Sequence, residues 1–268
     1  MLKDITLGQY FPGDTVAHRL DPRTKILMVL FYIIALFCAK DLVTYGMMAL
    51  CLAVCVRISK VGIHALVSGL KPVTIIILFT ALLNLFFTPG EHNLVEWGFQ
   101  HISDTGIHNA VFMVLRIMLL IMGTFLMTYT TSPIALTDGL ERLLNWMKAL
   151  HVPVHELAMM MSIALRFIPT LVEETDKIMS AQKARGADFE SGNLIQKAKA
   201  LIPILVPLFI SAFRRAEELA TAMECRCYHG GEGRTKLHVL KYQRRDILAL
   251  SVSGVIMAAV IILSRFGL

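Results

Sequence analysis

The sequence predicts an all-α membrane protein with about five transmembrane helices, one interfacial amphipathic helix and two long cytoplasmic helices. Of its 268 residues, 56% are hydrophobic and 17% are charged, whereas ordinary soluble domains carry about 25% charged residues. The mean hydropathy is +0.63. The charged residues are dense between positions 138 and 246, which leaves long apolar runs on either side. This composition excludes a disordered chain and a disulfide scaffold, and it argues against a soluble two-domain enzyme.

Five apolar runs are candidates for crossing a bilayer, which takes about 20 helical residues. The first two, 26–39 and 42–56, are separated by Lys40 and Asp41 alone, which predicts a tight helical hairpin completed by snorkelling side chains. The other three runs are 73–87, 110–130 and 247–263. We therefore expect a cytoplasmic segment, a region of four spans, a cytoplasmic or interfacial helical region and a last span, at residues 1–25, 26–130, 131–245 and 246–268.

The distribution of lysine and arginine predicts the orientation in the cell membrane. With the N-terminus inside, the inner segments 1–25, 57–71 and 131–245 hold 4, 3 and 16 of these residues, whereas the outer side holds Lys40 and Arg265. Basic residues in short loops favour the cytoplasmic side. The N-terminus is therefore expected to be cytoplasmic and the C-terminus extracellular. The net charge of +6 is explained by this asymmetry and gives no reason to expect nucleic-acid binding.

One charge, Arg116, lies inside an apolar run. Asn84 in the preceding run could lie at a similar depth, so a contact between the two side chains is one expectation. An interhelical hydrogen bond or snorkelling is favoured over a translocation site, because no cluster of carboxylates accompanies this arginine.

The region 131–245 is predicted to contain three helices. Ser132 and Pro133 are typical of an N-cap and a first helical position, and the amphipathic helix that follows should end near Leu150. Two long helices are expected next, at 154–185 and 194–226. Each is apolar in its first half and charged in its second half.

Each long helix ends in a small residue, an arginine and a second small residue. These two motifs are Ala184-Arg185-Gly186 and Cys225-Arg226-Cys227, and they lie 41 residues apart. Two similar helices that each present one charged tip suggest two similar partners. The alternative is that each arginine merely complements the helix dipole at its C-terminus.

Motifs for catalysis or nucleotide hydrolysis are absent from the sequence. It has no GxxxxGK[ST], no HExxH and no GxSxG. Cys225, Cys227 and His229 lie close together, but they lack the second ligand pair that a zinc site usually has. We therefore expect a protein that is no enzyme and has neither a cofactor nor a metal site.

The chain resembles, over essentially its whole length, the T component of energy-coupling factor transporters, which are vitamin and metal importers related to ABC systems. The resemblance rests on the stretch from His18 to Lys25, on the tail from Tyr228 to Thr235, and above all on the two small-Arg-small motifs. In the N-terminal stretch, Asp21 and Pro22 should start a helix, and Arg23 and Lys25 should hold its end in the cytoplasm. One departure is the pair of cysteines around Arg226, where Ala, Ser or Gly is more usual.

The resemblance implies the partners and the division of labour. Two ABC-type ATPase subunits would each bind one helix tip, through Ala184, Arg185, Gly186, Cys225, Arg226 and Cys227. The apolar halves of the long helices would hold a substrate-binding S component, with candidate contacts at Met159, Met160, Met161, Leu165, Leu205 and Phe209. ATP hydrolysis in the partners would then reorient the S component within the lipid bilayer to release its vitamin inside the cell.

Fifteen methionines favour a T component that is shared among exchangeable S components, because flexible thioethers suit surfaces with several partners. The alternative reading of these methionines is ordinary core packing. The other hypotheses are a T component dedicated to cobalt, nickel or biotin import, a stand-alone secondary transporter and a membrane scaffold. A secondary transporter would need inverted repeats and substrate groups at the middle of the membrane, and the sequence offers neither. The transported substrate is not encoded here, since that specificity would lie in another chain.

Overall fold

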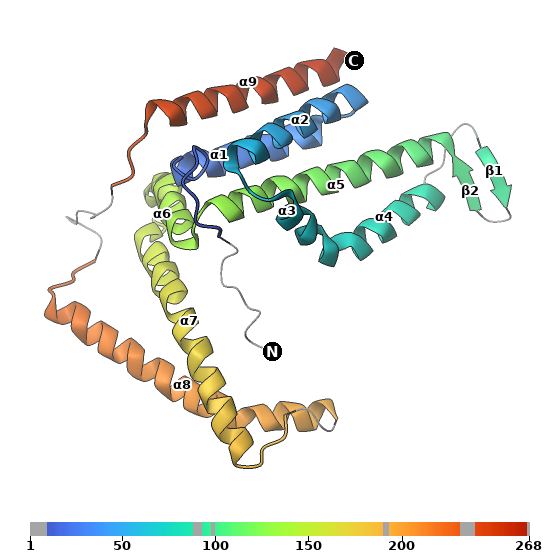
Figure 1. The fold of residues 1–268 in the computed structure, drawn as a ribbon. Helices are drawn as coiled ribbons and strands as arrows, with labels where there is room; N and C mark the ends of the chain where they lie inside the picture. The colour runs from blue at the N-terminus through green and yellow to red at the C-terminus, as the bar shows by residue number, and fades with distance from the viewer. Residues whose placement is uncertain (1–9, 88–92, 98–99, 190–192, 231–238, 267–268) are drawn as a thin grey trace. The chain divides into compact units, whose positions relative to one another are not determined.

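The computed structural model describes residues 10–87, 93–97, 100–189, 193–230 and 239–266, which are almost entirely helical (Figure 1). The predicted all-α membrane fold is confirmed, with the addition of one short hairpin. The chain divides into two compact units, Gly8–Leu140 with Leu240–Leu268 and Met1–Leu7 with Glu141–Val239. Each unit is considered by itself below.

The first unit contains all five of the predicted membrane spans. Its helices are α1 (Pro22–Cys38), α2 (Leu42–Ser59), α3 (Ile63–Leu70), the 3₁₀ turn η2 (Lys71–Val73), α4 (Thr74–Phe87), α5 (Asp104–Thr130), most of α6 (Pro133–Leu143) and α9 (Arg244–Phe266). The predicted hairpin turn is confirmed, because α1 ends at Cys38 and α2 begins at Leu42. The side chain of Thr44 exchanges hydrogen bonds with the backbone of Asp41 at this turn, which caps the start of α2.

Helix α1 forms the centre of this unit, where it packs against α5 and α9. Leu36 of α1, Met48 of α2 and Val260 of α9 are almost fully buried in one apolar core. Tyr32 donates a hydrogen bond to the Leu119 carbonyl at 3.0 Å. Its ring also lies so close to α5 that a Cβ atom at Gly123 would be 2.5 Å from it. The glycine is therefore what allows α1 and α5 to approach.

Three features of this unit were not anticipated. Helix α3 (Ile63–Leu70) lies within residues 57–71, which were expected to form an inner segment between two spans. Helix α5 begins at Asp104, six residues before the predicted start of its span. The strands β1 (Asn93–Trp97) and β2 (Gln100–Ser103) pair antiparallel ahead of α5. Figure 1 shows this hairpin next to the ends of α4 and α5.

The expected contact between Arg116 and Asn84 is not formed. Arg116 instead donates from Nε to the Tyr45 hydroxyl at 2.8 Å and from its terminal nitrogen to the Ala39 carbonyl at 3.1 Å. Asn84 donates to the Thr80 carbonyl of its own helix. Arg116 therefore holds the α1–α2 turn against α5, which is the interhelical role that the sequence favoured.

The second unit contains the continuation of the amphipathic helix and the two long helices. The 3₁₀ helix η3 (Leu144–Leu150) follows α6, so the predicted helix to Leu150 is present but tightens in its second half. Helix α7 is Val154–Ala184 and helix α8 is Leu194–Cys225, both within a residue of the predicted bounds. Pro169, Pro203 and Pro207 are accommodated inside them.

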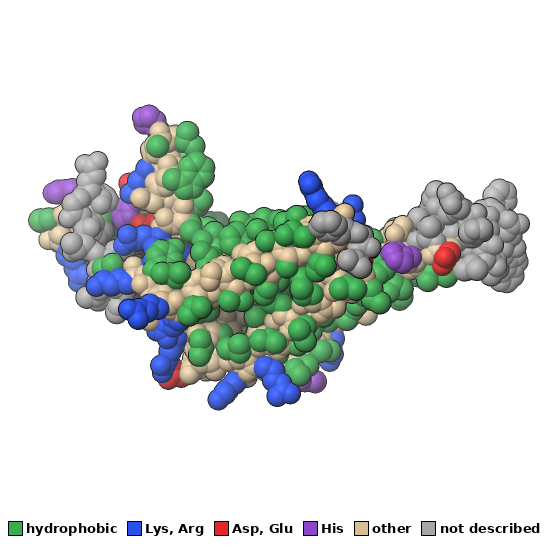
Figure 2. Space-filling view, turned by 90° about the horizontal axis from the view of Figure 1, so that it is seen from above, with side chains coloured by type: hydrophobic (Ala, Val, Ile, Leu, Met, Phe, Trp, Pro, Cys, Tyr) green, Lys and Arg blue, Asp and Glu red, His purple; other side chains and the backbone are tan. Residues whose placement is uncertain are grey.

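Six helical segments of the described residues are long and apolar enough to cross a membrane: Leu42–Ser59, Ile63–Phe86, Gly106–Thr130, Val154–Ala184, Ile195–Cys225 and Arg244–Arg265. Large hydrophobic side chains also cover much of the face seen in Figure 2, as expected of a surface in contact with lipid. The chain is therefore a multi-pass membrane protein. Helices α7 and α8 meet the length and composition criterion, so their cytoplasmic placement stays a prediction.

Candidate functional site

The tip of α7 ends in a Schellman motif, a helix-terminating turn with two characteristic backbone hydrogen bonds. Arg185 is the C-cap, and Gly186 follows it in the left-handed region with φ of +88°. Gly186 donates its N–H to the Lys183 carbonyl at 3.0 Å, and Ala187 donates to the Gln182 carbonyl at 3.0 Å. The turn thereby satisfies the last carbonyl groups of the helix and presents Arg185 at its end.

The tip of α8 repeats this turn bond for bond. Arg226 is the C-cap, and Cys227 follows it with φ of +56°. Cys227 donates to the Glu224 carbonyl at 2.9 Å, and Tyr228 donates to the Met223 carbonyl at 3.0 Å. Every donor and acceptor lies 41 residues after its counterpart in α7. The resemblance between the two tips is therefore one of backbone geometry as well as sequence.

The Schellman turn explains the glycine that follows Arg185 but not the cysteine that follows Arg226. The residue after each arginine adopts a positive φ, which suits glycine and costs a side-chain-bearing residue about 1–2 kcal/mol. Gly186 meets this requirement without strain, whereas Cys227 bears it. Arg185 and Arg226 are both exposed, and neither guanidinium has a hydrogen-bond or ion-pair partner among the described residues. Both are therefore available to a partner.

The two long helices meet at equivalent positions. Arg215 of α8 donates to a carboxylate oxygen of Glu174 in α7 at 2.8 Å. These residues are again 41 apart, and each precedes its tip arginine by 11 positions. At 1.5 Å per residue, each tip lies about 16 Å along its helix from this ion pair. Figure 1 shows α7 and α8 crossing, and the ion pair lies past the middle of each helix.

The ion pair at the crossing is partly open to solvent. The two side chains are 38% and 23% exposed, so the pair contributes less than about 1 kcal/mol to stability. Its effect is to fix which turns of the two helices touch.

The residues expected to contact an S component lie on the apolar halves of α7 and α8. Met160, Met161, Leu205 and Phe209 are exposed by 46% to 61%, and Met159 and Leu165 are half-buried. The exposed apolar surface of α8 is larger than the sequence suggested, and it also includes Leu201, Ile202, Val206, Ile210 and Phe213. This surface is available for a partner or for lipid.

A group of buried charges in the N-terminal stretch was missed as a structural site. Asp21 caps α1 by accepting from the N–H of Arg23, and their side chains form an ion pair at 2.8 Å. The N–H of Asp21 donates to buried Asp246 at 2.8 Å, which joins the starts of α1 and α9. Lys25 is only 7% exposed and donates to the Thr130 carbonyl at 2.8 Å. These charges tie three helices together, which is a structural role beyond the membrane boundary that the sequence predicted.

Comparison with known proteins gives one consistent result. Residues 13–237 match the family model described as CbiQ, cobalt transport protein. The chain is 55% identical over 266 residues to the energy-coupling factor transporter transmembrane protein EcfT of Clostridium kluyveri, covering 99% of this chain and 98% of the relative. It is 53% identical over 266 residues to EcfT of Acidaminococcus fermentans, covering 99% and 97%. It is 47% identical over 265 residues to EcfT of Bacillus subtilis, covering 99% and 100%. The matched region includes both helix tips.

Proposed function

The chain belongs to the CbiQ/EcfT family, the T components of energy-coupling factor transporters, and from this premise we propose that it couples two partner ATPase subunits to a substrate-binding S component for vitamin uptake. As a transmembrane subunit of a transporter it is of a non-catalytic type. ATP hydrolysis therefore belongs to its partners, and this chain transmits the resulting movement.

The observation that carries this proposal is the pair of matching Schellman turns, each presenting an exposed arginine. A guanidinium fork can donate two hydrogen bonds to one carboxylate, which gives both strength and a fixed direction. The small residues on either side, Ala184 with Gly186 and Cys225 with Cys227, let a partner surface approach the backbone. Two tips of the same geometry suit two copies of similar ATPase subunits, one at each tip.

The crossing of the two helices suggests how movement is transmitted. The Glu174–Arg215 pair fixes the crossing at equal distances from the two tips. When the ATPases close around ATP, the tips shift together, and the apolar halves beyond the crossing move in response. An S component held by the exposed side chains of those halves, among them Met161 and Phe209, would be reoriented by that shift.

Charge reversal at the tips tests this proposal. Arg185→Glu and Arg226→Glu should each weaken co-purification of the ATPase subunits and stop vitamin uptake, because a carboxylate would face a carboxylate. Arg214→Glu is the matched control, since Arg214 is an exposed arginine of α8 away from the tip. If both tip variants assembled and transported as well as Arg214→Glu, the coupling role would be refuted.

A second candidate is a T component dedicated to metal import, which the description of the family model as a cobalt transport protein favours. The methionine-rich surface on α7 supports the shared type instead. Isolation of this chain from its native membrane separates the two. Several different S components would support the shared type, and one metal-binding S component would support the dedicated type.

A further inference from the structure

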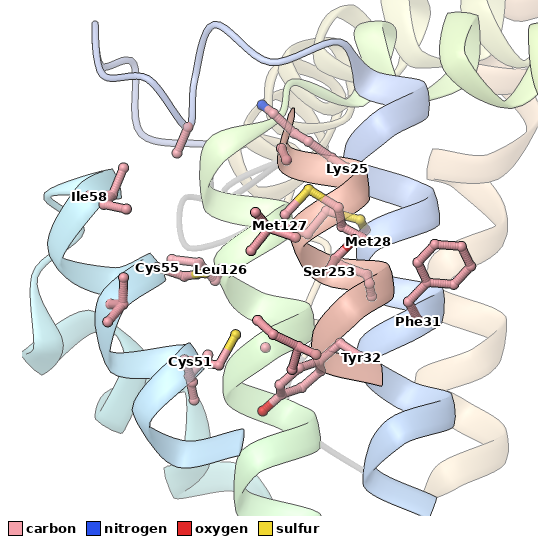
Figure 3. Close-up of a pocket in the computed structure, with 18 of the residues that line it drawn as sticks. Lys25, Met28, Phe31, Tyr32, Cys51, Cys55, Ile58, Leu126, Met127 and Ser253 are labelled. Atoms are coloured by element: carbon pink, nitrogen blue, oxygen red, sulfur yellow. The ribbon is translucent and has the colours of Figure 1, made fainter. Parts of the chain in front are cut away.

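An apolar groove runs between α1, α2, α5 and α9, all within the first unit (Figure 3). Its volume is about 610 Å³, within the range of roughly 300–1,000 Å³ that is usual for ligand sites. Met28, Tyr32, Cys51 and Met127 are among the side chains that line it. Methionine side chains adjust to irregular apolar shapes, so the walls suit a flexible hydrocarbon ligand.

One end of the groove is basic. Lys25 and Arg245 both line it, and they lie in the first turns of α1 and α9. The Nε atom of Arg245 is buried and has no hydrogen-bond partner among the described residues. The carboxylates nearby are already engaged, since Asp21 pairs with Arg23 and Asp246 accepts two backbone N–H bonds. A buried, charged N–H group that lacks a partner is costly, so the Nε atom of Arg245 points to an anionic ligand.

The length of the groove matches one leaflet of a bilayer. Along α1 it extends from Lys25 to Ala35, which is about 15 Å at 1.5 Å per residue. Half of a hydrocarbon core of about 30 Å has the same depth. The basic end lies on the side predicted to be cytoplasmic, where anionic lipids are concentrated, and basic pockets between transmembrane helices bind their headgroups.

We propose that this groove binds a phospholipid with an anionic headgroup. The acyl chain lies along the apolar walls, and the phosphate accepts hydrogen bonds from Arg245 beside Lys25. A helix of a partner protein is a poorer fit, because an apolar helix would leave the buried Nε atom of Arg245 without an acceptor. The bound lipid would stabilise the joint between the starts of α1 and α9.

Native mass spectrometry of the full-length chain tests the proposal, with dioleoyl phosphatidylglycerol and dioleoyl phosphatidylcholine as probes. The wild-type chain should retain phosphatidylglycerol about tenfold better, because the choline cation of phosphatidylcholine offsets the attraction between its phosphate and the basic end of the groove, whereas phosphatidylglycerol keeps a net negative charge. Arg245→Gln should abolish this preference, and Arg244→Gln, which changes an exposed neighbour outside the groove, should keep it. Equal preference in the two variants would overturn the headgroup assignment.

A second pair of variants tests the groove itself. Ser253 lines the groove, whereas Ser251 is exposed on the same helix and does not. Ser253→Phe should lower retention of both lipids, and Ser251→Phe should leave it unchanged. If Ser253→Phe retained lipid normally but lost an S component, a protein partner would occupy the groove and the proposal would be wrong. These measurements need no ATPase, so their failure would leave the coupling role untouched.

Discussion

The two Schellman turns predict that removing the glycine at one tip and introducing a glycine at the equivalent position of the other tip have opposite effects on the stability of the turn. The two substitutions are Gly186→Ala and Cys227→Gly. A Cβ atom at Gly186 would meet nothing within 4 Å, so Gly186→Ala would add no steric clash. Its cost is the backbone strain of a positive φ, about 1–2 kcal/mol. Cys227 already bears this strain with φ of +56°, so Cys227→Gly should recover a similar amount.

Hydrogen–deuterium exchange in nanodiscs measures this difference directly. The Ala187 amide, which bonds the Gln182 carbonyl, should exchange about 5- to 30-fold faster in Gly186→Ala, the factor that 1–2 kcal/mol supplies. The Tyr228 amide should exchange more slowly by a similar factor in Cys227→Gly. Gly46→Ala, at a helical position with equal space and no positive φ, is the control and should not weaken its helix. Unchanged exchange at both tips would refute the strain argument.

Two further sets of substitutions test contacts that hold the helices. Arg116→Leu should lower the free energy of unfolding by about 1–3 kcal/mol, because it leaves the buried Tyr45 hydroxyl without its donor. Thermal unfolding in detergent should show a smaller drop in the unfolding temperature for the control Asn84→Leu. A larger drop for Asn84→Leu than for Arg116→Leu would contradict the contact. Glu174→Arg and Arg215→Glu should each weaken the crossing of α7 and α8, and the double exchange should recover it. A double-mutant cycle should give a coupling energy below about 1 kcal/mol, and a coupling energy of zero would mean that the ion pair does not define the crossing.

The helices could be predicted well from sequence because their signals are local. Apolar runs place α2, α7 and α8 within a few residues of their observed bounds, and the cap Ser132-Pro133 places the start of α6. Helix α3 could not be recognised in the same way, because it is eight residues long and Lys71-Pro72 interrupts its apolar run before α4.

The contacts between distant residues could not be predicted. Asp21 and Asp246 are 225 positions apart, and nothing in either local sequence indicates that one bonds the other. Arg116 was expected near Asn84 from depth alone, but depth does not specify which side of α5 the arginine occupies. The left-handed turn at Gly186 did have a local signal, because glycine after a helix is typical of a Schellman turn. In the sequence, however, Gly186 was interpreted only as a small neighbour of Arg185.

The central claim is that each helix tip binds one ATPase subunit through its arginine. The most direct test is the mass of the complex purified from native membranes with the Arg185→Glu/Arg226→Glu double variant. We expect two ATPase subunits on the wild-type chain and on Arg214→Glu, and none on the double variant. Two subunits retained by the double variant would contradict the claim.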